Sequence, residues 1–178
     1  MKFQKEKIIL TGYRATGKSS IGKILADLLD FGFVDTDEVI EKRQGETIAD
    51  MVDRGGWDLF RRREADMLRE LAGSRHMVIA TGGGAVLHED AWDRLRQDAL
   101  VVLLTADVKT ICHRLAADDD TEEQRPALTE MGTMDEIAMV LRQRQPLYAK
   151  SADMAVDTEG KTPEQVAEFI VNEFKRGS

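Results

Sequence analysis

The sequence predicts an α/β fold in which helices cover a parallel sheet, and three observations support this prediction. Five apolar runs of strand length recur along the chain, and longer segments with helical periodicity separate them. Strands that alternate with helices in this way form a parallel sheet covered by helices. With 178 residues, the chain has room for one such core and is short for two, so we expect one domain over residues 1–178.

The expected strands and helices follow from the spacing of apolar residues. After the first strand, Ile21, Leu25 and Leu28 recur at helical spacing and predict one helix face packed on the sheet. The predicted strands are Lys7–Thr11, Phe33–Thr36, Met77–Thr81, Leu100–Thr105 and Met154–Asp157. The predicted helices are Ser19–Leu29, Asp58–Leu71, Asp90–Gln97, Val108–Ala117, Met134–Tyr148 and Pro163–Phe174. Residues 118–132 are acidic and end in glycine, which is typical of a mobile excursion.

Composition and charge narrow the class of protein. The formal net charge of −8 argues against general nucleic-acid binding, because phosphate neutralisation needs a surplus of basic residues. No apolar run approaches the length of a membrane span, and the first residues lack the apolar core of a signal peptide. Cys112 is the only cysteine, which excludes an internal disulfide and a cysteine-based metal site. We expect a cytoplasmic monomer that binds neither nucleic acid nor membranes.

The first strand leads into a glycine-rich loop that is typical of phosphate binding. Residues 12–19 read GYRATGKS and fit the pattern GxxxxGK[ST], with an apolar strand before them and an amphipathic helix after them. Free N–H groups at the start of such a helix point at an anion, Lys18 adds a positive charge, and the Ser19 hydroxyl can reach Mg²⁺. Ala15 stands where many such loops have another glycine, which reduces the freedom of the backbone. The alternative is an ordinary strand-to-helix turn.

A pair of carboxylates follows the second predicted strand. Enzymes with this phosphate loop usually place an acidic residue at the end of another strand, and Asp35 and Asp37 stand at the end of residues 33–36. Residues two apart on a strand project to the same side, so we expect both carboxylates to reach one site. One can help hold Mg²⁺ through water, and the other can orient or deprotonate an alcohol. Alternatively, both only cap the next helix.

Glycines and arginines complete the candidate site. The run Gly82 to Gly84 ends the third strand, where a ligand could approach backbone N–H groups directly, although a simple turn is the alternative. Arg61 and Arg144 lie on predicted helices and together could fix an anionic substrate, because a guanidinium grips a carboxylate with two hydrogen bonds. Arg125, in the predicted mobile segment, could close over the phosphates. For each arginine the alternative is a solvated surface charge.

The ordered motifs resemble those of shikimate kinases over nearly the whole chain. In family order and approximate spacing the chain carries GYRATGKSSIGKILADLL, FVDTDEVIE, FRRRE, VIATGGGAV, RPAL and RQRQPLY. The resemblance implies transfer of the γ-phosphate of ATP to the 3-hydroxyl of shikimate, a step toward chorismate and the aromatic amino acids. It also implies a P-loop kinase fold with a five-stranded parallel sheet in the order 2-3-1-4-5, a lid over about 118–132 and a substrate-binding helical region over about 38–73.

The resemblance also implies a role for each candidate residue, with ATP and Mg²⁺ as the cofactors and shikimate as the small-molecule substrate. The implied catalytic residues are Asp37, Lys18 and Arg125, and the implied metal ligands are Ser19 and Asp35. The implied nucleotide-binding residues are Gly12, Ala15, Thr16, Gly17, Lys18, Ser19, Ser20, Arg114 and Arg125. The implied shikimate-binding residues are Asp37, Arg61, Gly82, Gly83, Gly84 and Arg144. Trp57 stands where the family commonly has Glu, which leaves the partner of Arg61 to be found.

Two other functions stay open from the sequence. A small P-loop kinase of the same shape could act on gluconate or another polyol acid, since these substrates are also anionic alcohols. A nucleotide-binding regulatory module that has lost catalysis is the alternative from a different class. The presence of Asp37, Lys18 and Arg125 argues against that module, because a pure binder needs neither a base nor a mobile arginine.

Overall fold

The computed structural model describes residues 5–117 and 133–177. One five-stranded sheet, with all pairings parallel, has the strand order β2-β3-β1-β4-β5. The strands are β1 (Lys7–Thr11), β2 (Gly32–Asp35), β3 (Met77–Ala80), β4 (Ala99–Thr105) and β5 (Met154–Asp157). The expected class of fold and the expected order 2-3-1-4-5 are therefore confirmed.

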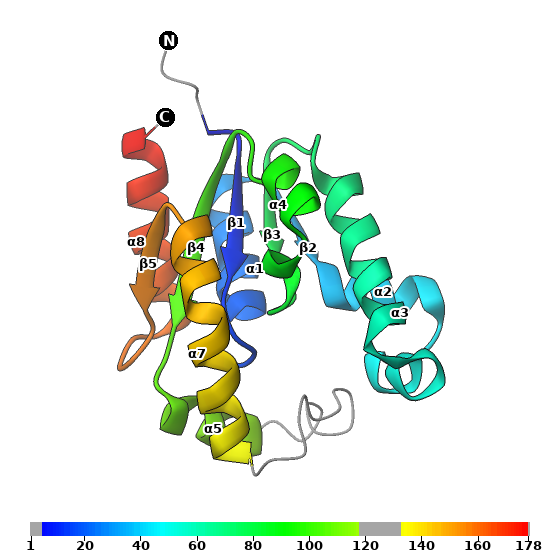
Figure 1. The fold of residues 1–178 in the computed structure, drawn as a ribbon. Helices are drawn as coiled ribbons and strands as arrows, with labels where there is room; N and C mark the ends of the chain where they lie inside the picture. Colours follow the sequence, from blue (N-terminus) through cyan, green and yellow to red (C-terminus); the bar gives the residue numbers. More distant parts are fainter. Residues whose placement is uncertain (1–4, 118–132, 178) are drawn as a thin grey trace.

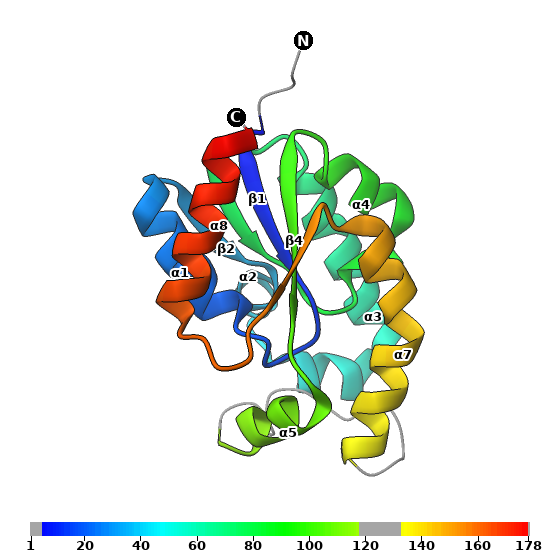
Figure 2. The ribbon, with the colours of Figure 1, turned by 90° about the vertical axis from the view of Figure 1, so that its left-hand side faces the viewer.

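Helices cover both faces of the sheet (Figures 1 and 2). On one face lie α1 (Lys18–Leu29) and α8 (Pro163–Gly177), and on the other lie α3 (Ile48–Leu71), α4 (Glu89–Leu95) and α7 (Thr133–Ser151). The remaining helical segments are α2 (Thr36–Gln44), the 3-10 turn η1 (Ala85–Leu87) and α5 (Val108–Ala116).

Alternate side chains of the central strands fill two separate cores. Ile9 of β1 packs with residues of α3 and α4, whereas its neighbours Ile8 and Leu10 pack with residues of α1 and α8. All three are fully buried. This alternation follows from the period of two along a strand, and a strand buried on both faces has to be apolar throughout.

The structure corrects the sequence prediction between residues 36 and 57. Strand β2 ends at Asp35, and Thr36 already begins α2, a helix that the apolar spacing did not reveal. Helix α3 begins at Ile48, ten residues before the expected Asp58, and its N-cap Thr47 forms a capping box with Asp50. Gly56 interrupts α3 with a φ of 71°, a left-handed value that glycine adopts without strain. These added segments supply Asp37, Ile48 and Trp57 to the pocket described below.

The carboxyl ends of the five strands meet at one edge of the sheet, where α5 and the loop after β1 also lie (Figure 1). Strand β1 is central, with β3 on one side and β4 on the other. In open α/β sheets, ligands bind outside the carboxyl ends of the strands, where the connections diverge to the two sides. Among the described residues, no helix is both long and apolar enough to cross a membrane.

Candidate active site

The loop after β1 has the backbone shape of a phosphate cradle. Gly17 precedes α1 with a φ of 94°, and no side chain caps the first turn of that helix, so its N–H groups face the loop. Gly12 has a φ of 136°, and a Cβ there would lie 2.4 Å from the carbonyl oxygen of Leu104. Ala15 adopts a left-handed φ of 60°, which costs about 1–2 kcal/mol for a residue with a Cβ.

Side chains of the same loop hold its shape from within. The Thr16 hydroxyl is buried and donates to the carbonyl oxygen of Tyr13 over 2.8 Å. Lys18 Nζ donates to the carbonyl oxygens of Gly12 and Tyr13, at 3.0 and 2.7 Å. The ammonium therefore lies over the loop, where an anion held by the N–H groups would meet it. Ser20 lies in the first turn of α1 and is exposed.

Ser19 and Asp35 meet at the start of the two helices. Ser19 Oγ donates to Asp35 Oδ2 over 2.5 Å, and Asp35 Oδ1 accepts from the backbone N–H groups of Asp37 and Glu38 as the N-cap of α2. The capping alternative is thus correct for Asp35, but the same carboxylate also reaches the phosphate loop. A serine hydroxyl beside a carboxylate is a donor set that suits Mg²⁺. Within the described ranges, no group of three or more His, Cys, Asp or Glu side chains has an arrangement that could hold a metal ion by itself.

Asp37 reaches the site by a different route from the one expected. It does not share a strand with Asp35, because β2 has ended; it lies in the first turn of α2, where only 5% of its surface is exposed. Its Oδ1 would be 2.6 Å from a Cβ built on Gly82, so the carboxylate lies against the glycine turn after β3. Asp37 thus faces the glycine turn, whereas Asp35 contacts Ser19 of the phosphate loop. The reasoning from strand alternation is wrong, because β2 ends at Asp35, and a shared site for the two carboxylates stays a prediction.

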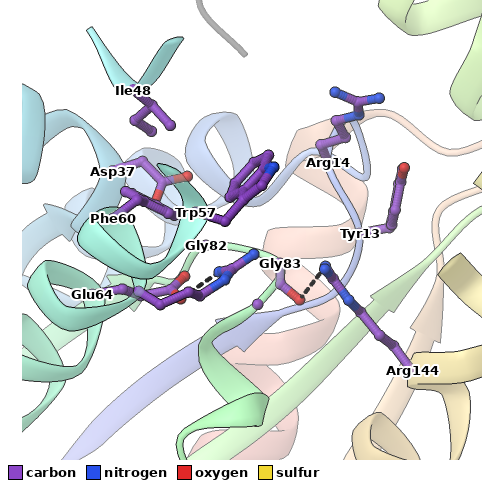
Figure 3. A pocket seen from close by; sticks show the side chains of 12 residues that line it. Tyr13, Arg14, Asp37, Ile48, Trp57, Phe60, Glu64, Gly82, Gly83 and Arg144 are labelled. Atoms are coloured by element: carbon purple, nitrogen blue, oxygen red, sulfur yellow. Dashed lines mark hydrogen bonds and ion pairs between the residues drawn. The ribbon is translucent and has the colours of Figure 1, made fainter. Parts of the chain in front are cut away.

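Asp37, Arg61, the three glycines and Arg144 line one pocket beside the phosphate loop (Figure 3). The pocket measures about 460 Å³ with the open space at its mouth. Its lining residues come from the loop after β1, from α2, α3 and α7, and from the turn after β3. The lining residues are Tyr13, Arg14, Asp37, Ile48, Trp57, Phe60, Arg61, Glu64, Gly82, Gly83, Gly84 and Arg144.

Glu64 is the partner of Arg61 that the sequence left open. Arg61 Nη1 donates to Glu64 Oε2 over 2.5 Å, and His88 Nε2 lies 2.8 Å from the same oxygen. The guanidinium also lies 5.2 Å from the ring centroid of Trp57, within the range of cation–π attraction. Burial alone would raise the pKa of the Glu64 carboxyl, but the hydrogen bond to His88 and the charge of Arg61 outweigh burial and lower that pKa.

The glycine turn makes room for these side chains. A Cβ on Gly84 would lie 1.9 Å from Arg61 Nη1, and one on Gly82 would lie 2.6 Å from Glu64 Oε1. Neither distance is compatible with a side chain. The Gly82 N–H already donates to the Thr36 hydroxyl over 3.0 Å, so close packing of the arginine and the carboxylates explains the run of glycines better than direct use of that N–H by a ligand.

Arg144 enters the pocket from α7. Its Nη1 donates to the Gly83 carbonyl oxygen over 3.0 Å, a contact drawn in Figure 3, and the Tyr148 hydroxyl donates to the same oxygen over 2.6 Å. Burial raises the pKa of Tyr148, which keeps the phenol protonated as a donor. Gly83 thus connects α7 to the turn after β3, and the guanidinium of Arg144 is positioned at the pocket wall.

Arg114 and Arg125 are two further predicted site residues, and the structure describes only the first of them. Arg114 of α5 donates to the carbonyl oxygen of Ala15 over 3.2 Å and to the Thr158 hydroxyl over 3.1 Å. It therefore joins α5 and the segment after β5 to the phosphate loop. Arg125 and the predicted lid, residues 118–132, lie outside the described residues.

Several pocket residues were not among the predicted site residues. Glu64 follows Arg61 at helical spacing, and this i, i+3 pair was the available signal for it. Ile48 belongs to the part of α3 that the sequence prediction missed. Tyr13 and Arg14 occupy variable positions of the phosphate-loop pattern, and only the packing of α7 against this loop, where Arg14 pairs with Glu136 over 3.4 Å, places them at the pocket.

The fold and this arrangement define a small P-loop kinase, with a phosphate loop after the central strand, an acidic residue after β2 and an acceptor pocket beside them. The family model described as shikimate kinase matches residues 14–175. A shikimate kinase of Thermodesulfovibrio yellowstonii is 41% identical over 171 residues, which cover 96% of each chain. The chain belongs to the shikimate kinase family.

Solved structures agree with this assignment. A shikimate kinase from Acinetobacter baumannii, solved in complex with shikimate, superposes with a TM-score of 0.89 at 30% identity, over 99% of this chain and 97% of that one. A gluconokinase from Sinorhizobium meliloti superposes with a TM-score of 0.59 at 16% identity, over 97% and 93% of the two chains. The second likeness is one of fold alone. Membership of a kinase family implies the use of ATP.

Proposed function

We propose that this chain transfers the γ-phosphate of ATP to the 3-hydroxyl of shikimate, which yields shikimate 3-phosphate and ADP. The observation that carries the proposal is one pocket that joins Asp37 to two arginines from distant helices, directly beside the phosphate loop. An anionic alcohol needs such a pocket, because its carboxylate needs cationic partners and its hydroxyl needs a nearby base. A pure nucleotide binder would need neither.

At the nucleotide end, the loop from Gly12 to Ser20 would hold the phosphates through its backbone N–H groups and Lys18. Ser19 and Asp35, already hydrogen-bonded to each other, would hold Mg²⁺, which supplies charge neutralisation to the phosphates when it is bound. Arg114 contacts the loop backbone at Ala15 and would lie on the side of the adenine. Arg125 remains a proposed lid arginine.

At the acceptor end, Arg61 and Arg144 would bind the carboxylate of shikimate. Figure 3 shows Arg144 and Asp37 on different sides of the pocket, with Gly83 between them. A substrate held by its carboxylate on the arginine side can therefore present a hydroxyl to Asp37. Gly82, Gly83 and Gly84 would form the wall against which the ring lies.

The proposed chemistry is an in-line displacement at phosphorus. The 3-hydroxyl oxygen forms a bond to the γ-phosphorus, its proton passes to Asp37, and the bond between that phosphorus and the bridging oxygen of ADP breaks. Lys18 stabilises the charge that spreads over the transferring phosphoryl group. Most of the rate enhancement in such reactions comes from positioning and charge neutralisation.

The test is Mg²⁺-dependent release of ADP with shikimate, with gluconate and with no acceptor. Turnover with shikimate alone is expected. Turnover with gluconate alone would redirect the proposal to another acid, and clear ATP binding without turnover would favour the regulatory module.

The role of Asp37 has its own test. Asp37→Asn should lower kcat about 1,000-fold, because general-base catalysis contributes about 100- to 10,000-fold. Asp53→Asn, at an exposed position of α3, is the matched control. Thermal unfolding of both variants would show that the fold is kept, and retained turnover in Asp37→Asn would remove Asp37 as the base.

The organisation as one domain with a substrate region over about 38–73, the cytoplasmic location, the monomeric state and the absence of nucleic-acid partners remain predictions from the sequence. Gel filtration with light scattering would test the monomer directly.

A further inference from the structure

His88 is a residue of the acceptor region for which neither the motifs nor the proposed reaction has a role. It follows η1, at the start of α4, and its side chain is mostly buried. Its Nε2 lies 2.8 Å from Glu64 Oε2, the oxygen that also accepts from Arg61. Glu64 therefore connects His88 to Arg61, an arginine of the substrate pocket, through one hydrogen bond on each side.

The carboxylate of Glu64 is held asymmetrically. Both of its donors, Arg61 and His88, share Oε2, whereas Oε1 is buried against Gly82 without a hydrogen-bond partner in the described part of the chain. Glu64 is also the only hydrogen-bond partner of Arg61 among the described residues, and the contact uses Nη1 alone. The rest of the guanidinium is available to a ligand.

Loss of the His88 donor would change this balance. A guanidinium and a carboxylate form their strongest pair through two parallel hydrogen bonds. A buried carboxylate that keeps only Arg61 as its partner would gain most by turning both oxygens toward it. The second guanidinium nitrogen would then serve Glu64 and not a substrate.

We propose that His88 is a positioning residue for the substrate carboxylate, an inference that rests on the proposed function. By donating to Glu64 Oε2, His88 holds that carboxylate to a single contact with Arg61 and keeps the outer donors of Arg61 directed into the pocket. His88 does not touch the substrate; it acts through Glu64. Nε2 must carry a hydrogen for His88 to act as this donor.

Two amide substitutions of His88 test whether a donor at the position of Nε2, within hydrogen-bond distance of Glu64, is what matters. Glutamine can place its amide nitrogen near the position of Nε2, whereas asparagine is one methylene shorter and cannot. His88→Asn should weaken shikimate binding about tenfold, the effect expected when a charged partner loses a hydrogen bond. His88→Gln should restore most of the affinity. Binding is measured by titration calorimetry, and KM for shikimate, KM for ATP and kcat are measured by ADP release.

The expected pattern is a raised dissociation constant and KM for shikimate in His88→Asn, with a much smaller change in kcat and in KM for ATP. His76→Asn is the matched control. His76 has a left-handed φ of 50° that asparagine tolerates, and its ring meets Phe31 edge to face, away from the pocket. If His88→Asn does not fold, His88→Leu replaces it. Equal losses in the Asn and Gln variants, or unchanged shikimate binding in Asn or Leu, would overturn the proposal.

A double-mutant cycle tests whether His88 acts through Glu64. In the Glu64→Gln background, His88→Asn should change the dissociation constant for shikimate less than about twofold, because its partner is already altered. If His88→Asn weakens shikimate binding as much in the Glu64→Gln background as in the wild type, His88 does not act through Glu64. A wild-type protein that neither binds nor phosphorylates shikimate would overturn the proposed function itself, and this inference with it.

Discussion

The phosphate loop and the acceptor pocket lie side by side but are built in different ways. The loop is one continuous stretch, Gly12 to Ser20, whose shape depends on glycine conformations and on hydrogen bonds within the loop. The pocket collects side chains from the loop after β1, from α2, α3 and α7, and from the turn after β3. A phosphate-binding loop can therefore be predicted from one short stretch of sequence, whereas recognition of the acceptor depends on how elements far apart in the chain pack together. Variants of the two regions should therefore separate catalysis from acceptor binding.

The largest expected effect comes from a variant of the phosphate loop that should lose catalysis but keep shikimate binding. Lys18→Met should lower kcat on the order of 1,000-fold, since removing a preorganised charge from a transition state costs about 100- to 1,000-fold, while calorimetry should give an unchanged dissociation constant for shikimate. Lys23→Met, on the exposed side of α1, is the control. A parallel loss of shikimate binding would mean that the two regions are not independent.

A variant of the glycine turn after β3 should have the opposite effect, a loss of shikimate binding while ATP binding is kept. Gly84→Ala places a Cβ where the Arg61 guanidinium lies, so Arg61 must move, and a displacement of about 1 Å can cost about 100-fold. KM for shikimate should rise by that order while ATP binding is kept. Gly73→Ala is the control, because a Cβ there meets no atom within 4 Å. Unchanged KM would show that Arg61 can relocate freely.

A smaller effect is expected at Arg144. Arg144→Lys keeps the positive charge but loses the planar fork, so shikimate affinity should fall roughly tenfold, with kcat less affected. Arg142→Lys, at an exposed position of the same helix, should bind shikimate as the wild type does. An unaltered KM in Arg144→Lys would remove Arg144 from the site.

The last expected effect concerns the free energy of unfolding and its dependence on pH, and not catalysis or binding. The pKa of Glu64 is lowered from 4.5 on folding, so the folded state binds fewer protons than the unfolded state. The ionised carboxylate therefore stabilises the fold above pH 4.5, and this contribution is lost as the pH falls through the lower folded pKa. Glu64→Gln should cost about 2 kcal/mol at neutral pH, and urea unfolding should show a smaller difference from the wild type in acid.

Glu70, a carboxylate in an exposed ion pair, is the control for the urea-unfolding measurement on the buried Glu64. Its pKa is lowered by a hydrogen bond from Arg43, but both side chains are about half exposed, so water and salt screen the pair. Glu70→Gln should leave the urea midpoint nearly unchanged, with any difference removed by added salt. A constant Glu64→Gln difference from neutral pH to below the folded pKa would show that the Glu64 pair gives no pH-dependent stability.

Much of the fold could be predicted from the sequence because its signals are local. The strands β1 and β5 have the predicted bounds, and the other strands agree within one residue at each end. Apolar periodicity missed helix α2 because only Thr36, Asp37 and Ile40 are buried along it, so it has no apolar stripe. The family resemblance implied helical structure over about 38–73, and the caps Asp35 and Gly45 set the ends of α2. The order of the strands came from the family resemblance and not from periodicity.

The phosphate loop could be predicted from the sequence alone, since a GxxxxGK[ST] pattern between a strand and a helix contains all the backbone groups that the loop needs. The acceptor pocket, in contrast, depends on tertiary packing. The contact of Glu64 with His88 spans α3 and the start of α4, and that of Arg144 with Gly83 spans α7 and the turn after β3. Such pairings depend on the packing of helices over the carboxyl edge of the sheet, and no local pattern records the distance between side chains that are far apart in the chain.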